Sequence, residues 1–192
     1  SAVALSTGST ANYSFTYVAG TLTITAAAQT ISFPTISSKV YGSGTFTASA
    51  TATSALTVTF ASTTTAICTV SGTTVTIIRV GTCTLTADQA GNANYNAAAQ
   101  VSQSITITKA VLTATASSHT VAFGASAPSV TVAYSNFANG DNANTASFTT
   151  GLVAPTCSTT YTSAAVAGSS VATVCSGGSS TNYTFSFVDG TT

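Results

Sequence analysis

Cys83-Thr-Leu-Thr-Ala87 alternates apolar residues with threonine, and this alternation decides the fold class. Successive side chains of a strand point to opposite faces, so a period of two predicts one buried face and one wet face. The same pattern recurs in Leu56-Thr-Val-Thr-Phe60, Val75-Thr-Ile77 and Ile105-Thr-Ile-Thr108. Helical periodicity is absent, and Gly- and Asn-rich turns separate the runs at the short spacing of a β-sandwich. The predicted fold class is all-β.

The turns divide the chain into three pieces, which we interpret as tandem immunoglobulin-like β-sandwich modules with a short segment in front. Residues 28–109 form a complete module, because seven short strands are what such a sandwich needs. Residues 110–192 form a second module, joined to the first through Thr108-Lys-Ala110. The strands predicted for the first module lie near residues 29–34, 45–50, 56–61, 66–70, 73–79, 82–88 and 101–108. Those of the second lie near residues 111–116, 119–123, 129–134, 146–150, 171–175 and 182–188.

A long-period repeat links the two ends of the chain. Ala11-Asn-Tyr-Ser-Phe-Thr-Tyr-Val-Ala-Gly-Thr21 reappears as Thr181-Asn-Tyr-Thr-Phe-Ser-Phe-Val-Asp-Gly-Thr191, at an offset of 170 residues. Such self-similarity is typical of modular arrays, in which each unit is a structural copy. The first copy continues into the alternating run Leu22-Thr-Ile-Thr25, whereas the second stops at Thr192. We therefore expect residues 1–27 to be the closing strands of a preceding module, and the module at 110–192 to lack its last strand.

The motifs of both modules resemble known repeat families. In the first module, Gln29-Thr-Ile-Ser-Phe-Pro34, Lys39-Val-Tyr-Gly42 and Gly91-Asn-Ala-Asn-Tyr95 look like the bacterial Ig-like repeats of very large surface proteins. The second module resembles the companion MBG domain, through Tyr134-Ser-Asn-Phe-Ala-Asn-Gly-Asp141 and through Phe123-Gly124, which stands where that family usually has Tyr-Gly. The resemblance implies extracellular stalks, adhesins or fibres, and it brings no catalytic residues with it.

The composition argues against acid–base catalysis. Three Lys/Arg, three Asp, one His and no Glu give a net charge of zero and leave almost no groups for acid–base work. His119 has no evident base partner for a nucleophilic arrangement, so we expect no enzyme, no catalytic residue, no metal and no cofactor. We also expect no nucleic-acid partner, and no membrane span in this chain, because no run of 18 apolar residues occurs.

Four cysteines fall as one close pair in each half of the chain. Zinc ligation is the competing interpretation, but the short Cys spacings and His partners of structural zinc sites are missing. We favour disulfides, which indicate an oxidising compartment and an extracellular or cell-surface location. Of the three connectivities, the one within modules is preferred: Cys68 with Cys83, and Cys157 with Cys175.

Three further features each carry a functional and a structural interpretation. The sequons at Asn12 and Asn182 are candidate glycosylation sites, and they occupy equivalent places in the repeat. The aspartates lie in Asn- and Gly-rich loops, where turn chemistry is a simpler explanation than calcium binding. Alternating aromatic residues could stack on sugars or could belong to the core, and core packing is the preferred interpretation; they are Tyr13, Phe15, Tyr17, Tyr183, Phe185 and Phe187.

The function predicted is an extracellular structural repeat unit of a surface fibre, filament or adhesin stalk. A segment made of Thr21, Leu22, Thr23, Ile24, Thr25 and Ala26 is a candidate donor strand that completes the 110–192 module of another copy, by strand donation or by continuation of one long chain. The partner is then the chain itself, associated head-to-tail, together with any glycans. The alternative is a carbohydrate- or mucin-binding adhesin module, with an accessory region of a secreted hydrolase as a third candidate. The null hypothesis is that the ends were cut at arbitrary points.

Overall fold

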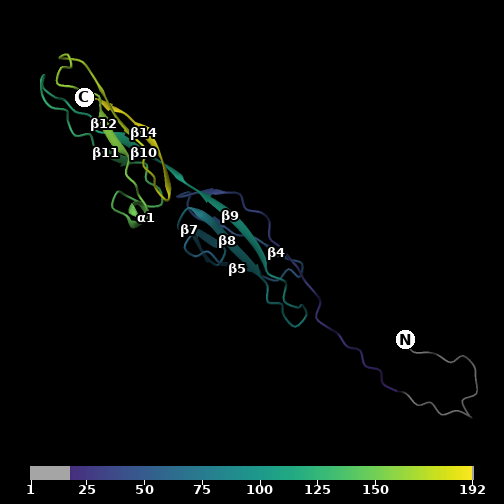
Figure 1. The fold of residues 1–192 in the computed structure, drawn as a ribbon. Helices are drawn as coiled ribbons and strands as arrows, with labels where there is room; N and C mark the ends of the chain where they lie inside the picture. Colours follow the sequence, from purple (N-terminus) through teal and green to yellow (C-terminus); the bar gives the residue numbers. More distant parts are fainter. Residues whose placement is uncertain (1–17, 192) are drawn as a thin grey trace, which may run out of the picture.

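The computed structural model describes residues 18–191, and it is all-β apart from one helical turn. The ribbon is elongated, with two β-rich parts in line and the N-terminal segment leaving from one end (Figure 1). Residues up to Thr108 build the first part, and residues from Ala110 onward build the second. Only Lys109 separates the last strand of one part from the first strand of the next.

The first module contains three sheets, which the chain forms from alternating apolar and Thr residues. The four-stranded sheet has the order β2-β9-β8-β5, the three-stranded sheet β3-β7-β6, and β1 pairs with β4. The strands are β1 (Ile31–Ser32), β2 (Lys39–Val40), β3 (Phe46–Thr47), β4 (Thr51–Ala52), β5 (Thr59–Ser62), β6 (Cys68–Ser71), β7 (Thr74–Ile77), β8 (Gly81–Asp88) and β9 (Val101–Thr108).

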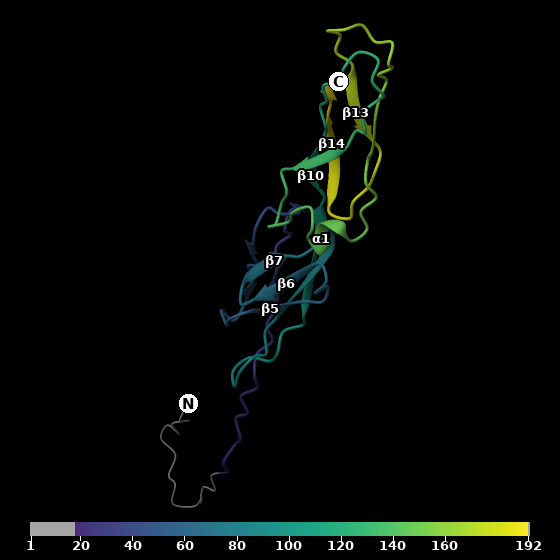
Figure 2. The ribbon, with the colours of Figure 1, turned by 90° about the vertical axis from the view of Figure 1, so that its left-hand side faces the viewer.

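The second module contains two three-stranded sheets, with the orders β11-β10-β14 and β12-β13-β15. Strand β14 runs parallel to β10, whereas β11 is antiparallel to it. Figure 2, turned by 90°, shows β13 and β14 side by side with the C-terminus at the far end of the molecule. The elements are β10 (Ala110–Ala116), β11 (Val132–Ser135), α1 (Ala146–Thr149), β12 (Thr156–Thr159), β13 (Ala172–Ser176), β14 (Tyr183–Val188) and β15 (Gly190–Thr191).

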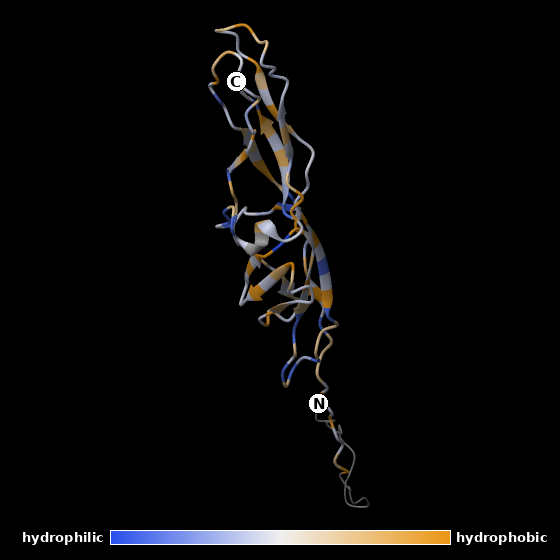
Figure 3. Cartoon of the chain, turned by 60° about the vertical axis from the view of Figure 1, so that its left-hand side comes forward, coloured by the Kyte–Doolittle hydropathy of each residue, from blue (hydrophilic) through white to orange (hydrophobic). Residues whose placement is uncertain are grey.

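The core follows the alternation that the sequence shows. Along β9, Ile105 and Ile107 are buried, whereas Thr106 and Thr108, which alternate with them, are exposed. Coloured by hydropathy, the strands are banded, with apolar and polar residues in turn along their length (Figure 3). The buried residues form one cluster that runs from the first module into Leu112, Phe148 and Tyr183 of the second.

Two strands expected in the second module are not formed. Residues 119–123 have no strand in the described chain, although His119 donates a backbone hydrogen bond to Thr191. The segment expected to be a strand at 146–150 is instead the helical turn α1, because Phe148 and Thr149 both donate backbone hydrogen bonds to the carbonyl of Thr145. The ring of Phe148 is buried against Tyr134, Phe137 and Tyr183, so tertiary packing of one ring outweighs the local alternation.

Candidate functional site

The two modules meet at a joint formed by two tyrosines. Tyr41 follows β2 in the first module, and Tyr183 begins β14 in the second; both rings are buried and they meet edge to face at 5.6 Å between centroids. Gly42, next to Tyr41, has a left-handed backbone, which glycine adopts without strain. Its lack of a side chain also lets the loop at Ala138 pack closely, because a Cβ at position 42 would collide with the Cβ of Ala138. Apolar contact between the modules is thus concentrated where the chain crosses from one to the other.

Asp141 connects the two hydroxyl groups. Its Oδ2 accepts a hydrogen bond from the Tyr41 hydroxyl at 3.0 Å and from the Tyr183 hydroxyl at 2.6 Å. The Tyr183 hydroxyl also accepts from the backbone N–H of Ala138 at 3.0 Å. Burial, reinforced by the hydrogen bond to Asp141, raises the pKa of Tyr183 well above its ordinary range. The phenol therefore stays protonated and keeps donating at any physiological pH.

The backbone of the joint is tied as well. The side-chain Oδ1 of Asn182 accepts a hydrogen bond from the N–H of Val80 at 3.1 Å. The backbone carbonyl of Asn182 accepts a hydrogen bond from the N–H of Ala110 at 3.0 Å. On the linker itself, Nζ of Lys109 donates to the carbonyl of Ser180 at 2.7 Å. The bond from Val80 links the 180–183 segment to the first module, and the bond from Lys109 links it to the linker; the bond from Ala110 lies within the second module. The joint is consequently a fixed connection and not a flexible tether.

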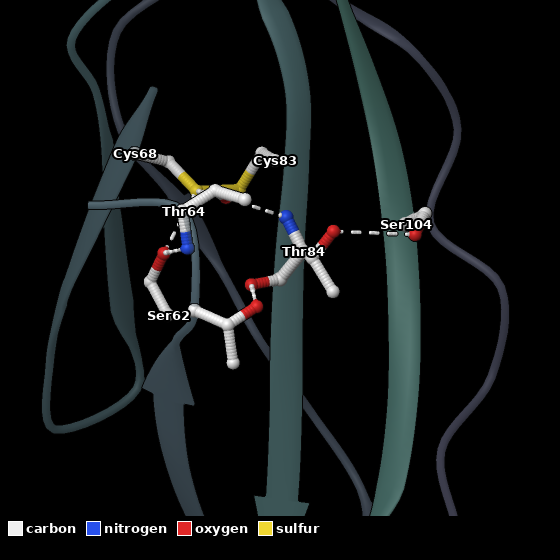
Figure 4. The surroundings of a disulfide bond; sticks show 7 residues. Ser62, Thr64, Cys68, Cys83, Thr84 and Ser104 are labelled. Carbon is white, nitrogen blue, oxygen red and sulfur yellow. Dashed lines mark hydrogen bonds between the residues drawn. A yellow bond between two sulfur atoms is a disulfide. The ribbon is translucent and has the colours of Figure 1, made fainter. Parts of the chain in front are cut away.

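Two disulfides brace the modules, and they have different roles. Cys68 on β6 bonds to Cys83 on β8, so this bridge joins the two main sheets of the first module. Figure 4 shows Ser62 and Thr64 around it, with the N–H of Thr84 donating to Oγ1 of Thr64 at 2.9 Å. Cys157 and Cys175 are direct partners on neighbouring strands, β12 and β13, so the second bridge lies within one sheet. These are the two pairs that the sequence favoured.

The candidate donor segment has no strand partner within the described residues. Leu22 is 87% exposed and Ile24 is 88% exposed, in backbone that forms neither helix nor sheet. The chain joins the first module at Ala26 and Ala27, whose carbonyls accept from Asn96, and the N–H of Ala27 donates to Asn94. Two large apolar side chains, spaced for one face of a strand, are therefore held out in solvent.

Several residues singled out by sequence lie in unexpected surroundings. Asn182 is only 2% exposed, so its side chain is not accessible in the folded joint, and glycosylation there stays a prediction that the fold disfavours. Asn12, like Tyr13, Phe15 and Tyr17, lies outside the described residues. The buried ring of Tyr183 serves the joint and offers no platform for a sugar.

The ionisable groups outside the joint have simple polar neighbours in the described part of the chain. Nε2 of His119 is 2.8 Å from Oγ of Ser117, and Gln100 donates to Oδ1 of Asp88 at 2.7 Å. Within residues 18–191, no group of three or more His, Cys, Asp or Glu side chains could hold a metal ion. None of the helices among these residues is long and apolar enough to cross a membrane.

Sequence reasoning missed the joint. Asp141 was interpreted as a turn residue of the run Asn139-Gly-Asp141, and Tyr41 as part of a family motif. The local signal in the sequence is Tyr41 beside Gly42, but the hydrogen-bond partner of Tyr41, Asp141, lies 100 residues away in the sequence.

One protein-family model matches part of the chain. Residues 112–192 match the model of the MBG domain, YGX type. Over these residues the second module is similar to that domain. Domains of this kind occur as repeats in large surface proteins, and the family is structural and not enzymatic. No curated protein and no solved structure matches the chain significantly.

Proposed function

We propose that the chain is a structural repeat unit of an extracellular surface fibre, filament or adhesin stalk, built from immunoglobulin-like modules and joined head-to-tail by strand complementation. The observation that carries this proposal is the exposed segment Thr21–Ala26, a strand sequence without a sheet. An added strand supplies backbone hydrogen bonds along a sheet edge and buries alternate side chains, here Leu22 and Ile24.

The joint supports a mechanical role. A spacer must hold its modules in line, and the bonds from Tyr41 and Tyr183 to Asp141 fix the crossing between them. The two disulfides limit how far each module can unravel under load, since residues between bridged cysteines stay in a closed loop. Two disulfides also suit an oxidising environment outside the cell.

Electron microscopy of the purified, oxidised chain at increasing concentration tests this function. Wild type should form filaments, and Ile24→Asp should remain monomeric because a charge cannot enter a strand-binding site without a partner. Val18→Asp is the matched control: Val18 is equally exposed in the same segment but precedes the strand sequence, so this variant should assemble. A wild-type chain that stays monomeric, or an Ile24→Asp chain that forms filaments, contradicts the proposed assembly.

A further inference from the structure

The loop that supplies Asp141 to the joint contains a tight turn. The N–H of Asp141 donates to the carbonyl of Ala138 at 3.0 Å. The two residues between them, Asn139 and Gly140, both have left-handed backbone, with φ of 56° and 75°. Positive φ at both central positions defines the type I′ turn, for which Asn-Gly is a preferred sequence. The backbone geometry therefore accounts for the pair, and the pair also has a chemistry of its own.

Asn139-Gly140 is the single Asn-Gly pair in the sequence. The side-chain amide of asparagine has a carbonyl carbon that the backbone nitrogen of the next residue can attack, which is one reason why asparagine is thermolabile in proteins. Glycine favours this attack because it has no side chain to obstruct its nitrogen and because its backbone turns freely. Every other asparagine of the chain is followed by Ala, Thr, Tyr or Phe.

Both reacting groups are accessible in the folded protein. Asn139 and Gly140 are exposed, and a Cβ built at Gly140 would have no atom within 4 Å. Within residues 18–191, the N–H of Gly140 donates no backbone hydrogen bond that would hold its nitrogen in place. The amide of Asn139 makes one long contact, from Nδ2 to the hydroxyl of Tyr41 at 3.3 Å. The attack therefore needs rotation within two exposed residues and no opening of the core.

The same loop contains a natural comparison. Asn136 is also exposed and also left-handed, with φ of 65°. It is followed by Phe137, whose ring packs against Phe148 and Tyr183 and so fixes the backbone nitrogen that would attack. Nδ2 of Asn136 donates to Oγ1 of Thr113 at 2.9 Å. The two asparagines thus share exposure and backbone conformation, and they differ in the residue that follows.

We propose that Asn139 is a site of spontaneous deamidation that weakens the joint between the modules. The nitrogen of Gly140 attacks Cγ of Asn139, so that a C–N bond forms; the proton of that nitrogen passes to water, and the side-chain nitrogen leaves as ammonia. Water then adds to either carbonyl of the cyclic imide and opens it to aspartate or isoaspartate. Water is the co-reactant, and nothing is oxidised or reduced.

The reaction would take place between two anchors of the joint. On one side, the N–H of Ala138 donates to the hydroxyl of Tyr183 at 3.0 Å. On the other side, Asp141 accepts from the hydroxyls of Tyr41 and Tyr183. Isoaspartate adds a carbon to the backbone between Ala138 and Asp141, so the turn that sets their spacing is lost. Both products also place a new carboxylate near that of Asp141, and nearby like charges repel.

The consequence is a change in how the two modules are held. In the intact joint, Tyr41 and Tyr183 share Asp141; after the reaction, the remaining polar ties are the bonds from Val80 and Lys109 to the 180–183 segment. The reaction needs no enzyme, and its extent depends on elapsed time and on pH, because the attacking nitrogen must lose its proton. This inference is independent of how copies of the chain associate.

Ageing of the oxidised chain in mildly alkaline buffer tests the site. Peptide mapping by mass spectrometry measures the converted fraction at each asparagine over time, and labelling with isoaspartyl methyltransferase detects isoaspartate. Asn139 should convert many times faster than Asn136, and a mildly acidic buffer should slow the conversion. Conversion at Asn139 that is no faster than at Asn136 overturns the proposal.

Amide hydrogen exchange on the same samples tests the effect on the joint. The N–H groups of Ala138 and Asp141 should lose protection in step with conversion, whereas the N–H of Leu85, within β8, should keep its protection. Asn139→Gln should age without this loss, because its longer side chain closes the ring poorly. Asn136→Gln is the matched control: it places the same side chain in left-handed backbone but keeps Asn139, so it should age like wild type.

The outcomes separate the reaction from its effect. Conversion at Asn139 with unchanged protection of Ala138 and Asp141 would show that the joint does not depend on this turn, and would overturn the proposed weakening. If Asn139→Gln does not fold, the intact and isoaspartate fractions of aged wild type are separated by ion exchange and compared. Equal protection of Ala138 and Asp141 in the two fractions contradicts the proposal.

Discussion

At the scale of single residues, Tyr183 connects sequence to architecture. The repeat places a Tyr at this position, and the structure uses its ring against Tyr41 and its hydroxyl on Asp141. A buried phenol needs a partner for its O–H, and here the partner lies in the loop that packs on the first module. The side chain of Tyr183 thus fills part of the core with its ring and connects the two modules through its hydroxyl.

Removing that hydroxyl should destabilise the protein. Tyr183→Phe leaves the N–H of Ala138 without its acceptor and Asp141 with one donor fewer, so we expect a loss of about 1–3 kcal/mol in the free energy of unfolding. Denaturation in urea measures it. Tyr161→Phe is the control, since the Tyr161 hydroxyl is 3.4 Å from the carbonyl of Ala125 and should cost much less. Equal losses in the two variants would show that the joint contributes nothing.

The raised pKa of Tyr183 predicts how stability depends on pH. A phenol with its pKa raised by folding favours the folded state below its unfolded pKa of about 10, and this contribution is lost as the pH rises from there toward the folded value. The melting temperature should therefore be level from neutral pH to about pH 9 and fall above pH 10. Burial also raises the pKa of Tyr134, so Tyr183→Phe should reduce the alkaline fall without abolishing it. An equally steep fall in that variant would assign the effect to other groups.

At the scale of secondary-structure elements, the disulfides differ in what they connect. Both close loops of similar length, with sequence separations of 15 and 18, and each restricts the unfolded chain by about 3 kcal/mol. The Cys68–Cys83 bridge also joins two sheets and is fully buried. Cys157 and Cys175 lie on strands that are already paired by hydrogen bonds.

Replacing the bridges should therefore have unequal effects. We expect Cys68→Ala/Cys83→Ala to lower the free energy of unfolding by more than Cys157→Ala/Cys175→Ala, because the first also leaves a cavity between sheets. Urea titration of both double variants checks this. A larger loss from the second pair would mean that the second module depends on its bridge for the fold itself.

The long alternating strands were predictable because their signal is local. Strand β9 was expected at 101–108 and β8 at 82–88, and the structure has both with the alternation facing the core. The cysteine pairs could be predicted for a similar reason, because their sequence separations are only 15 and 18. By contrast, α1 depends on the ring contacts of Phe148 with residues distant in the sequence, and the bond from Tyr41 to Asp141 joins residues 100 apart. Local pattern cannot report such contacts.

At the scale of the whole molecule, the two β-rich parts lie in line, with the exposed N-terminal segment at one end. Leu22 and Ile24 are exposed in that segment, and Phe123 and Val166 are exposed in the second module. The proposed head-to-tail assembly would cover Leu22 and Ile24, whose exposure to water is otherwise unfavourable. The few charges of the chain leave this contact almost free of electrostatic constraint.

The most direct measurement is a cryo-electron microscopy reconstruction of the assembled form. The account predicts one extended strand, Leu22–Thr25 of one copy, paired along a sheet edge of the next copy. Density that shows contacting copies joined without this segment as a strand would contradict the account.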